Sequence, residues 1–588
     1  MRLFLGLILF WVSTFGYLLF FKKKTKIPYE FLLPIVFTLI GIVMFLAGIL
    51  NMMREVSILI CLIGIILFIY KFVKKEIEFK KILNVNFIIL LVIFLYLTIV
   101  CSQMQLLHYD NFSHWGLIIK NMFLDNNLPN FENSVMEFRN YQPGSACFIY
   151  YFAALVGKTE ASMIIAQNYL LAAYLFSLLV FINSKFKDKK KIILNVLLIA
   201  MYVFMLCANI MFNDLLVDTL IAAMLICSFA ILYYFKDDLK RAFIYNLPIL
   251  IYLFLVKNIG IILVGFSCLG LLYIGYRNKN LKMGFVYALI SGVITVAFFY
   301  IWTKHVSYVY GTLSLYSKHS LSSQNIISEL QMKGFDRILE FCGIYLKHFI
   351  DILNNIPNIY MIVINIIIVL FIVLYKNYRK HFVFCLVLVD IIYLLYYAIL
   401  GVMYLLSMPW SEAVYLAGFD RYMLTIILII IGLVFIFLVN VIMKEKKIST
   451  KSIVLTSSII VMFVLLTFNY YISDYKVFVG DIDYENSIPY RFDEKLGTNM
   501  FDASEDEFYY IYAPVTSKND SGYLHYLSRY KLNTDNVLIV KYISDFDNEI
   551  DNNLNKIIIV FDEDEDIMNY IKDNDYIEND NIYSKKRS

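Results

Sequence analysis

The sequence predicts an all-α polytopic membrane protein of about fourteen transmembrane helices, followed by a small extracytoplasmic α/β domain. Hydrophobic residues make up 60% of the 588 residues and charged residues only 17%, whereas soluble domains are nearer half apolar and a quarter charged. The apolar residues fall into separate blocks, and most of these can cross a ~30 Å hydrocarbon core as a helix. After about residue 471 the chain is instead polar and acidic.

Clusters of lysine and arginine between the apolar blocks set the predicted topology, because short cytoplasmic loops collect these residues. The clusters lie at 22–26, 71–81, 185–191, 236–241, 277–282, 376–380 and 444–451. With all of them inside, both termini lie outside and the predicted spans are 2–20, 31–50, 57–73, 85–105, 161–183, 192–210, 214–235, 243–256, 259–276, 283–303, 357–375, 382–406, 421–441 and 452–470. The short block at 147–157 is expected to be re-entrant or interfacial.

Three regions follow from this map. Residues 1–84 are N-terminal transmembrane helices, residues 85–470 form a membrane core with external loops at 106–146 and 304–356, and residues 471–588 form the external domain. Alternating and periodic patterns in that domain predict strands at 507–513 and 556–561 and helices at 521–532 and 565–572. Its acidic run at 562–566 either binds calcium or is a solvated loop that caps the next helix.

Composition excludes several function classes. The net charge of +4 comes from a basic membrane part and an acidic tail, which gives no support for nucleic-acid binding. The eight cysteines fall mostly within apolar blocks, so neither a disulfide framework nor a zinc site is expected.

The densest polar cluster follows the fourth predicted span, at 108–116. A helix that begins at Asp110 would place Asp110, His114, Asn121 and Asp125 on one face, as an amphipathic helix at the membrane surface. Asp110 then either caps this helix while His114 is a surface histidine, or acts as the general base that deprotonates an acceptor hydroxyl.

Further along the same loop, Arg139 and Tyr141 precede a Pro-Gly turn and an aromatic stretch. Arg139 is a candidate partner for a phosphate, and the aromatic residues are candidates for a sugar or prenyl groove. The alternative is that Arg139 is an ordinary interfacial arginine.

Ionisable residues also stand at the outer ends of predicted spans. They are Asp214 and Asp218, Lys257, and Arg421. The topology places them on the same outer surface as Asp110, where Lys257 and Arg421 would bind the phosphate of a lipid-linked substrate. The alternative is that the two cations snorkel or pair with Asp218 and Asp420.

This pattern resembles the GT-C class of membrane glycosyltransferases, which take sugars from polyprenyl-phosphate donors on the external face. Asp110, in Tyr109-Asp110-Asn111, occupies the place of the class's catalytic base in an early external loop. The turn at 141–144 is similar to the Pro-rich turn of the class, and the segments at 218, 257–260 and 420–422 look like its outer-end groups. Three apolar blocks precede the span that leads into the acidic loop, whereas the usual loop follows the first span.

The resemblance implies an inverting glycosyltransferase of a bacterial cytoplasmic membrane, with a polyprenyl-phosphate sugar donor and a glycan or lipid acceptor of the cell envelope. No cofactor is expected, although Asn111 stands where a second acidic residue is sometimes found, which leaves a divalent cation open. Two alternatives remain. One is a transporter or flippase of lipid-linked saccharides, with the mid-span Asp390 and the broken 243–276 segment as its site. The other is a polymerase of such saccharides.

Overall fold

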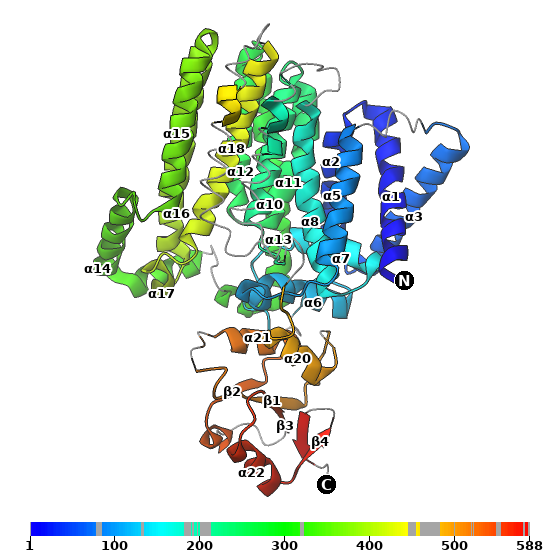
Figure 1. Ribbon diagram of the computed structural model, residues 1–588, viewed down its shortest axis with the longest axis vertical. Helices are drawn as coiled ribbons and strands as arrows, with labels where there is room; N and C mark the ends of the chain where they lie inside the picture. Colours follow the sequence, from blue (N-terminus) through cyan, green and yellow to red (C-terminus); the bar gives the residue numbers. More distant parts are fainter. Residues whose placement is uncertain are drawn as a thin grey trace.

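The protein is a bundle of long helices with a small sheet domain at one end (Figure 1). The computed structural model describes residues 2–77, 85–130, 135–181, 213–317, 323–444, 482–547 and 554–585, except for 499, 519, 521, 580 and 581, with short pieces at 190, 193–196, 198–199 and 454–458. The first residue of the described chain and the sheet domain lie at the same end of the bundle.

Helices coincide with the predicted spans wherever the structure describes them. Ten helices in the described part of the chain are long and apolar enough to cross a membrane, which makes this a membrane protein in architecture. They are α1 (Arg2–Thr25), α2 (Tyr29–Ile49), α3 (Met53–Val73), α8 (Glu160–Phe176, with its 3₁₀ extension), α11 (Leu239–Val256), α12 (Gly260–Arg277), α13 (Leu281–Tyr310), α15 (Ile356–Leu374), α16 (Arg379–Ser407) and α18 (Phe419–Lys444).

Two shorter apolar helices, α5 (Val85–Cys101) and α10 (Asp218–Tyr234), occupy two more predicted spans. The spans predicted at 192–210 and 452–470 lie largely outside the described residues, so the total of fourteen stays a prediction. Helix α11 begins at Leu239, which makes this span longer than the 243–256 block predicted from hydropathy.

Glycines allow backbones to approach closely at two points that matter for the site. A Cβ on Gly144, at the start of α7 (Gly144–Val156), would lie 2.5 Å from the carbonyl oxygen of Leu255 near the end of α11. A Cβ on Gly260 would lie 2.5 Å from the carbonyl oxygen of Leu253. These approaches fix the short break between α11 and α12, where Lys257 adopts an extended conformation.

The described residues of the predicted external segment 304–356 are largely helical. Helix α13 continues to Tyr310, and α14 (Ser323–Ile350) follows with a kink at Gly334, whose φ of 65° favours glycine. Buried Lys333 of α14 donates to the carbonyl oxygens of Leu405 and Met408, at 2.8 and 2.5 Å. This lysine therefore caps the C-terminal end of α16, just before α17 (Trp410–Ala413).

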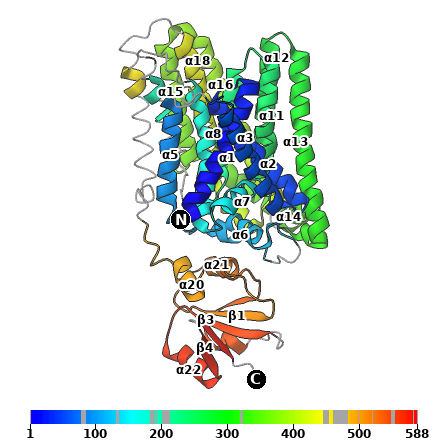
Figure 2. The same cartoon turned by 90° about the vertical axis from the view of Figure 1, so that its right-hand side faces the viewer.

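The segment after α5 also differs from its prediction. It forms a π-helical turn, η1 (Asn111–Trp115), that continues into α6 (Gly116–Asp125), and both are largely buried between the bundle and the sheet domain (Figure 2). It is therefore no amphipathic helix on a membrane surface. Asp110 makes no side-chain capping bond, and His114 is buried, so both parts of the capping interpretation are wrong.

The C-terminal domain is a five-stranded sheet with strand order β2-β1-β3-β5-β4. Its strands are β1 (Glu507–Tyr512), β2 (Val537–Val540), β3 (Asn555–Val560), β4 (Tyr576–Asn579) and β5 (Ile582–Lys585). Strands β1, β2 and β3 are parallel, and β5 runs antiparallel to β3 and β4. Helices α20 (Ile488–Leu496) and α21 (Tyr523–Leu532) face the bundle, whereas α22 (Glu565–Asp573) lies at the far end (Figures 1 and 2).

Two aspartates of the acidic run at the start of α22 accept hydrogen bonds from backbone amides. The Asp564 side chain accepts a hydrogen bond from the Ile567 amide at 2.9 Å. Asp562 accepts from the amides of Val515 and Thr516, at 2.8 and 2.7 Å. The Asp564 bond matches the expectation that the run caps the next helix, whereas Asp562 binds the turn that follows β1.

Helix α21 docks onto the loop that contains Asp110. Lys531 lies within 3.2 Å of Glu160 and 2.7 Å of Asp493, and the side chains of Lys531 and Glu160 are fully buried. Lys120 of α6 donates to the carbonyl oxygens of Tyr530 and Lys531, each at 2.7 Å, and so satisfies the C-terminal end of α21. These buried charges join the sheet domain to the bundle.

We expect Lys531→Met to weaken this junction strongly, because it leaves the Glu160 and Asp493 carboxylates buried without their main partner. Breaking a buried ion pair costs about 3–5 kcal/mol. The measurement is the thermal unfolding midpoint of the full chain in detergent. Lys518→Met, at an exposed position of the same domain, is the matched control and should change little. Equal midpoints for the two variants would contradict the junction.

Candidate active site

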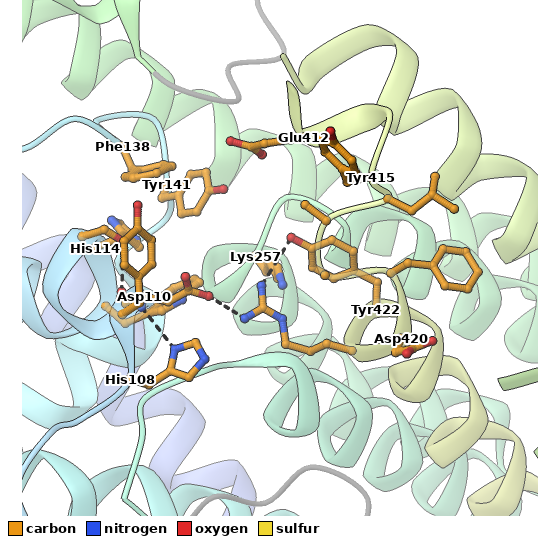
Figure 3. Close-up of a pocket in the computed structure, with 18 of the residues that line it drawn as sticks. His108, Asp110, His114, Phe138, Tyr141, Lys257, Glu412, Tyr415, Asp420 and Tyr422 are labelled. Atoms are coloured by element: carbon orange, nitrogen blue, oxygen red, sulfur yellow. Dashed lines mark hydrogen bonds and ion pairs between the residues drawn. The ribbon is translucent and has the colours of Figure 1, made fainter. Parts of the chain in front are cut away.

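A cavity of about 720 Å³ opens at the end of the bundle that carries the C-terminal domain (Figure 3). Four parts of the chain form most of its wall: the loop around η1, the break between α11 and α12, the segment from α17 into α18, and α21. Its volume is within the range of ~300–1,000 Å³ that is usual for ligand sites.

A chain of charges links helices that are far apart in sequence. Arg421 at the start of α18 donates through Nη1 to Asp110 Oδ2 at 2.5 Å, although 311 positions separate the two residues. The Arg421 Nε atom lies 3.6 Å from Asp218 Oδ2, and Lys257 Nζ lies 2.6 Å from Asp218 Oδ1. The sequence prediction that these four residues share one surface therefore corresponds to direct contact.

Burial differs between the two carboxylates. The Asp218 side chain is only 4% exposed and lies behind the two cations, whereas Asp110 is 26% exposed and lines the cavity. A buried carboxylate is stable only when it is paired, so Asp218 holds Lys257 and Arg421 in place. Tyr422 supports both cations, with its ring 4.9 Å from Lys257 Nζ and 5.2 Å from Arg421 Cζ.

A third carboxylate lies close by, in the loop before α10. Asp214 is buried and accepts a hydrogen bond from the Leu216 amide at 2.6 Å. Burial raises its pKa to about 7, and the nearby Arg421 only partly opposes that shift. Helix α10 begins at Asp218, four residues after the predicted start of that span, so Asp214 lies outside the helix.

The π-helical turn positions Asp110. The backbone amide of Asp110 donates to His108 Nδ1 at 3.1 Å, and the Asn111 side-chain oxygen accepts from the Leu215 amide at 3.0 Å. Turns of this kind often occur at functional sites. The Asn111 bond ties the turn to the loop before α10, so Asp110 and Asp218 are held by neighbouring segments.

Aromatic rings form the wall on the Asp110 side (Figure 3). The His114 ring lies 4.5 Å from Trp115 and 4.6 Å from Tyr141, measured between ring centres. Phe138 lies 5.1 Å from Tyr141. Burial, together with the nearby Lys257, lowers the pKa of His114 to about 3, so its imidazole is neutral at physiological pH.

Most of the residues predicted from sequence meet in this cavity. Asp110, His114, Tyr141, Lys257 and Arg421 line it, and Asp218 lies directly behind the cations.

Arg139 is the exception. Its Nη1 atom lies 3.5 Å from the carbonyl oxygen of Leu313, and its guanidinium lies 5.7 Å from the Tyr310 ring. It therefore lies against the end of α13 and away from the cavity wall, which gives no support to its predicted phosphate contact. The position of Arg139 in the sequence shows that it lies in this loop. It does not show whether the side chain points into the cavity or packs against the end of α13.

Several lining residues were not singled out from sequence. Glu412, Tyr415 and Tyr526 come from segments that carry no catalytic motif, and they reach the cavity only through tertiary packing. Tyr526 in particular belongs to α21 of the C-terminal domain.

Both cations and carboxylates line the cavity. Within the described ranges, no three histidine, cysteine, aspartate or glutamate side chains cluster closely enough to hold a metal. Asn111, which had left a divalent cation open, is buried and its oxygen is bonded to the Leu215 amide.

The low pKa of His114 predicts a pH dependence of stability. Unfolded histidine titrates near pH 6.5, so between about 6.5 and 3 the unfolded chain binds one more proton than the folded chain. Stability is therefore lost as the pH falls through this window. We expect His114→Phe to lose less thermal stability between pH 7 and pH 4.5 than the unmodified protein. If both proteins lose the same thermal stability between pH 7 and pH 4.5, protonation of His114 does not destabilise the fold and the prediction is wrong.

Comparisons with protein-family models, with curated proteins and with solved structures find no match to this chain.

Proposed function

We propose that this protein is a membrane glycosyltransferase that transfers a sugar from a polyprenyl-phosphate donor to a cell-envelope glycan or lipid, with inversion at the anomeric carbon. One observation carries the proposal: a partly exposed carboxylate, Asp110, and two cations held by a buried carboxylate line the same cavity at the end of a transmembrane bundle. Transfer of a sugar from a lipid phosphate requires a base that deprotonates the acceptor and, next to it, a site that stabilises the departing phosphate.

The charge distribution supports an external site. Helix ends with lysine and arginine clusters, such as those of α1 and α12, lie at the end of the bundle away from the C-terminal domain (Figure 1). The positive-inside rule assigns that end to the cytoplasm. The cavity and the domain then face outward, in the cytoplasmic membrane of a bacterium.

Lys257 and Arg421 are the proposed donor-phosphate site. Arginine and lysine bind phosphate strongly when they are already oriented, and Asp218 and Tyr422 orient both. A smaller apolar pocket of about 50 Å³ borders Lys257 and continues past Ile259 toward Met403 on α16. This pocket supports a lipid donor, because it offers an apolar surface next to the cations for the first part of a prenyl chain.

The proposed reaction is a single displacement. The acceptor hydroxyl passes its proton to Asp110 while its oxygen attacks the anomeric carbon of the donor sugar. The bond between that carbon and the phosphate oxygen breaks, and its electron pair leaves with the lipid phosphate. Lys257 and Arg421 stabilise the negative charge that develops on the departing oxygen.

Donor binding and base activation are coupled in this scheme. In the structure Arg421 donates a hydrogen bond to the Asp110 carboxylate. This bond takes up one of the two carboxylate oxygens. A phosphate that takes over Arg421 Nη1 would release Asp110 beside a new negative charge. The freed carboxylate is then open to accept the proton of the acceptor hydroxyl.

The transporter alternative has less support. Asp390 accepts a hydrogen bond from Asn365 of α15 at 2.8 Å, so its polar group is matched by a neighbouring helix. The break between α11 and α12 contributes Lys257 to the end cavity. A polymerase would use the same site with a growing glycan as its acceptor, and is a special case of the proposed reaction.

We expect Asp110→Asn to lower transfer by about 10²–10⁴-fold, the usual contribution of a positioned general base. The measurement is transfer from a radiolabelled polyprenyl-phosphate sugar by membranes that contain the full-length protein. Asp125→Asn, in the same loop but outside the cavity wall, is the matched control and should retain activity. Expression and the unfolding midpoint should be the same for both variants. Full activity of Asp110→Asn would rule out the proposed base.

A further inference from the structure

The cavity has two unlike walls. Lys257 and Tyr422 lie on one side, and Asp110 faces them from the other (Figure 3). Arg421, which precedes Tyr422 in the chain, bonds to Asp110. Besides His108 and Ser113, six further aromatic residues line the side that holds Asp110. These are Tyr109, His114, Trp115, Phe138, Tyr141 and Tyr526.

We propose that this aromatic wall is the acceptor subsite, that it binds a neutral sugar ring, and that Tyr526 of the C-terminal domain is part of it. The inference rests on the proposed function, because Asp110 must touch the acceptor hydroxyl. It goes further by naming a carbohydrate as the acceptor and by giving the C-terminal domain a direct role in binding it.

Aromatic faces and polar tips together suit a sugar. The faces of Tyr and Trp rings pack against the C–H groups of a pyranose, and their polar edges reach its hydroxyls. In this wall His114, Trp115 and Tyr141 pack within 4.5 to 5.8 Å of one another, so the surface is formed before a ligand arrives. A preformed surface loses little entropy on binding.

His114 has unused hydrogen-bonding capacity at this wall. Its side chain is 2% exposed, and neither ring nitrogen has a hydrogen-bond partner among the described residues. A neutral imidazole donates from one nitrogen and accepts at the other, so a sugar hydroxyl can bond to either of them. An apolar lipid acceptor would leave both nitrogens buried and unsatisfied, which is costly.

The C-terminal domain brings Tyr526 to the wall in a fixed orientation. The Tyr526 hydroxyl donates to Glu137 Oε2 at 3.0 Å, and its ring lies 5.0 Å from that of Tyr109. Arg529, one turn further along α21, also pairs with Glu137. The ring of Tyr526 is therefore held over the same segment that positions Asp110.

Trp115 provides a binding signal that does not depend on catalysis. Only four tryptophans are present, and Trp115 is the one that lines the cavity wall. The experiment titrates the full-length protein in detergent with neutral glucan, mannan, galactan and N-acetylglucosamine oligomers and records tryptophan fluorescence. We expect a saturable change with at least one oligomer, and its loss in Trp115→Phe.

The variants separate this subsite from the reaction. We expect His114→Phe and Tyr526→Ala each to weaken oligosaccharide binding about three- to tenfold, whereas Tyr526→Phe retains most of it. Tyr542→Ala, at an exposed position of the same domain, is the matched control and should bind normally. Asp110→Asn keeps a hydrogen-bonding side chain at this position, so it should still bind the oligomers although its transfer falls by about 10²–10⁴-fold.

Two results would overturn the inference. One is the absence of a saturable signal with every neutral oligomer in the unmodified protein. The other is unchanged affinity in both His114→Phe and Tyr526→Ala. If either occurs while Asp110→Asn still abolishes transfer, the glycosyltransferase proposal stands and the acceptor is not a neutral sugar. If Asp110→Asn transfers normally, the proposed function fails independently of the binding data.

Discussion

The site depends on one buried carboxylate. Asp218 opens α10 behind the cavity and holds Lys257 from the break after α11 and Arg421 from the start of α18. Without Asp218, the side chains of Lys257 and Arg421 would have no fixed position at the end of the bundle, and they could turn toward the solvent. Asp218 bonds Lys257 and forms an ion pair with Arg421 at 3.6 Å, so one side of each cation faces Asp218 and the other side can face a ligand. Arg421 uses its second side to bind Asp110, which joins the proposed base to the proposed anion site.

The second constraint is the C-terminal domain. Its helix α21 covers the π-helical turn on one side, while the bundle covers the other, and Lys120, Glu160, Lys531 and Asp493 fill the junction with paired charges. A turn that carries a catalytic group on a free loop would be mobile, so this cover gives the turn a defined geometry. The domain therefore contributes both to the position of Asp110 and, through Tyr526, to the cavity wall.

Sequence patterns predicted the spans and the meeting of the charged groups for a physical reason. Charges at helix ends are costly in lipid, so the topology alone gathers Asp110, Asp218, Lys257 and Arg421 at one end of the bundle. The same reasoning placed Arg139 at that end but could not tell the cavity from the neighbouring end of α13, because this depends on packing within the loop. One of the two interpretations of the turn placed His114 on the surface, because nothing in the sequence shows that α21 covers this turn. Tyr526 lies more than 400 positions after His108, and only the docked domain brings it to the cavity.

The central claim is that Asp110 and the donor phosphate compete for Arg421. Isothermal titration of the full-length protein in detergent with a short-chain isoprenyl phosphate tests it directly. The account predicts that Asp110→Asn binds this phosphate more tightly than the unmodified protein. It also predicts a larger gain than in Asp420→Asn, which removes a carboxylate that lines the same cavity. Equal or weaker binding by Asp110→Asn, or an equal gain in the two variants, would contradict the claim.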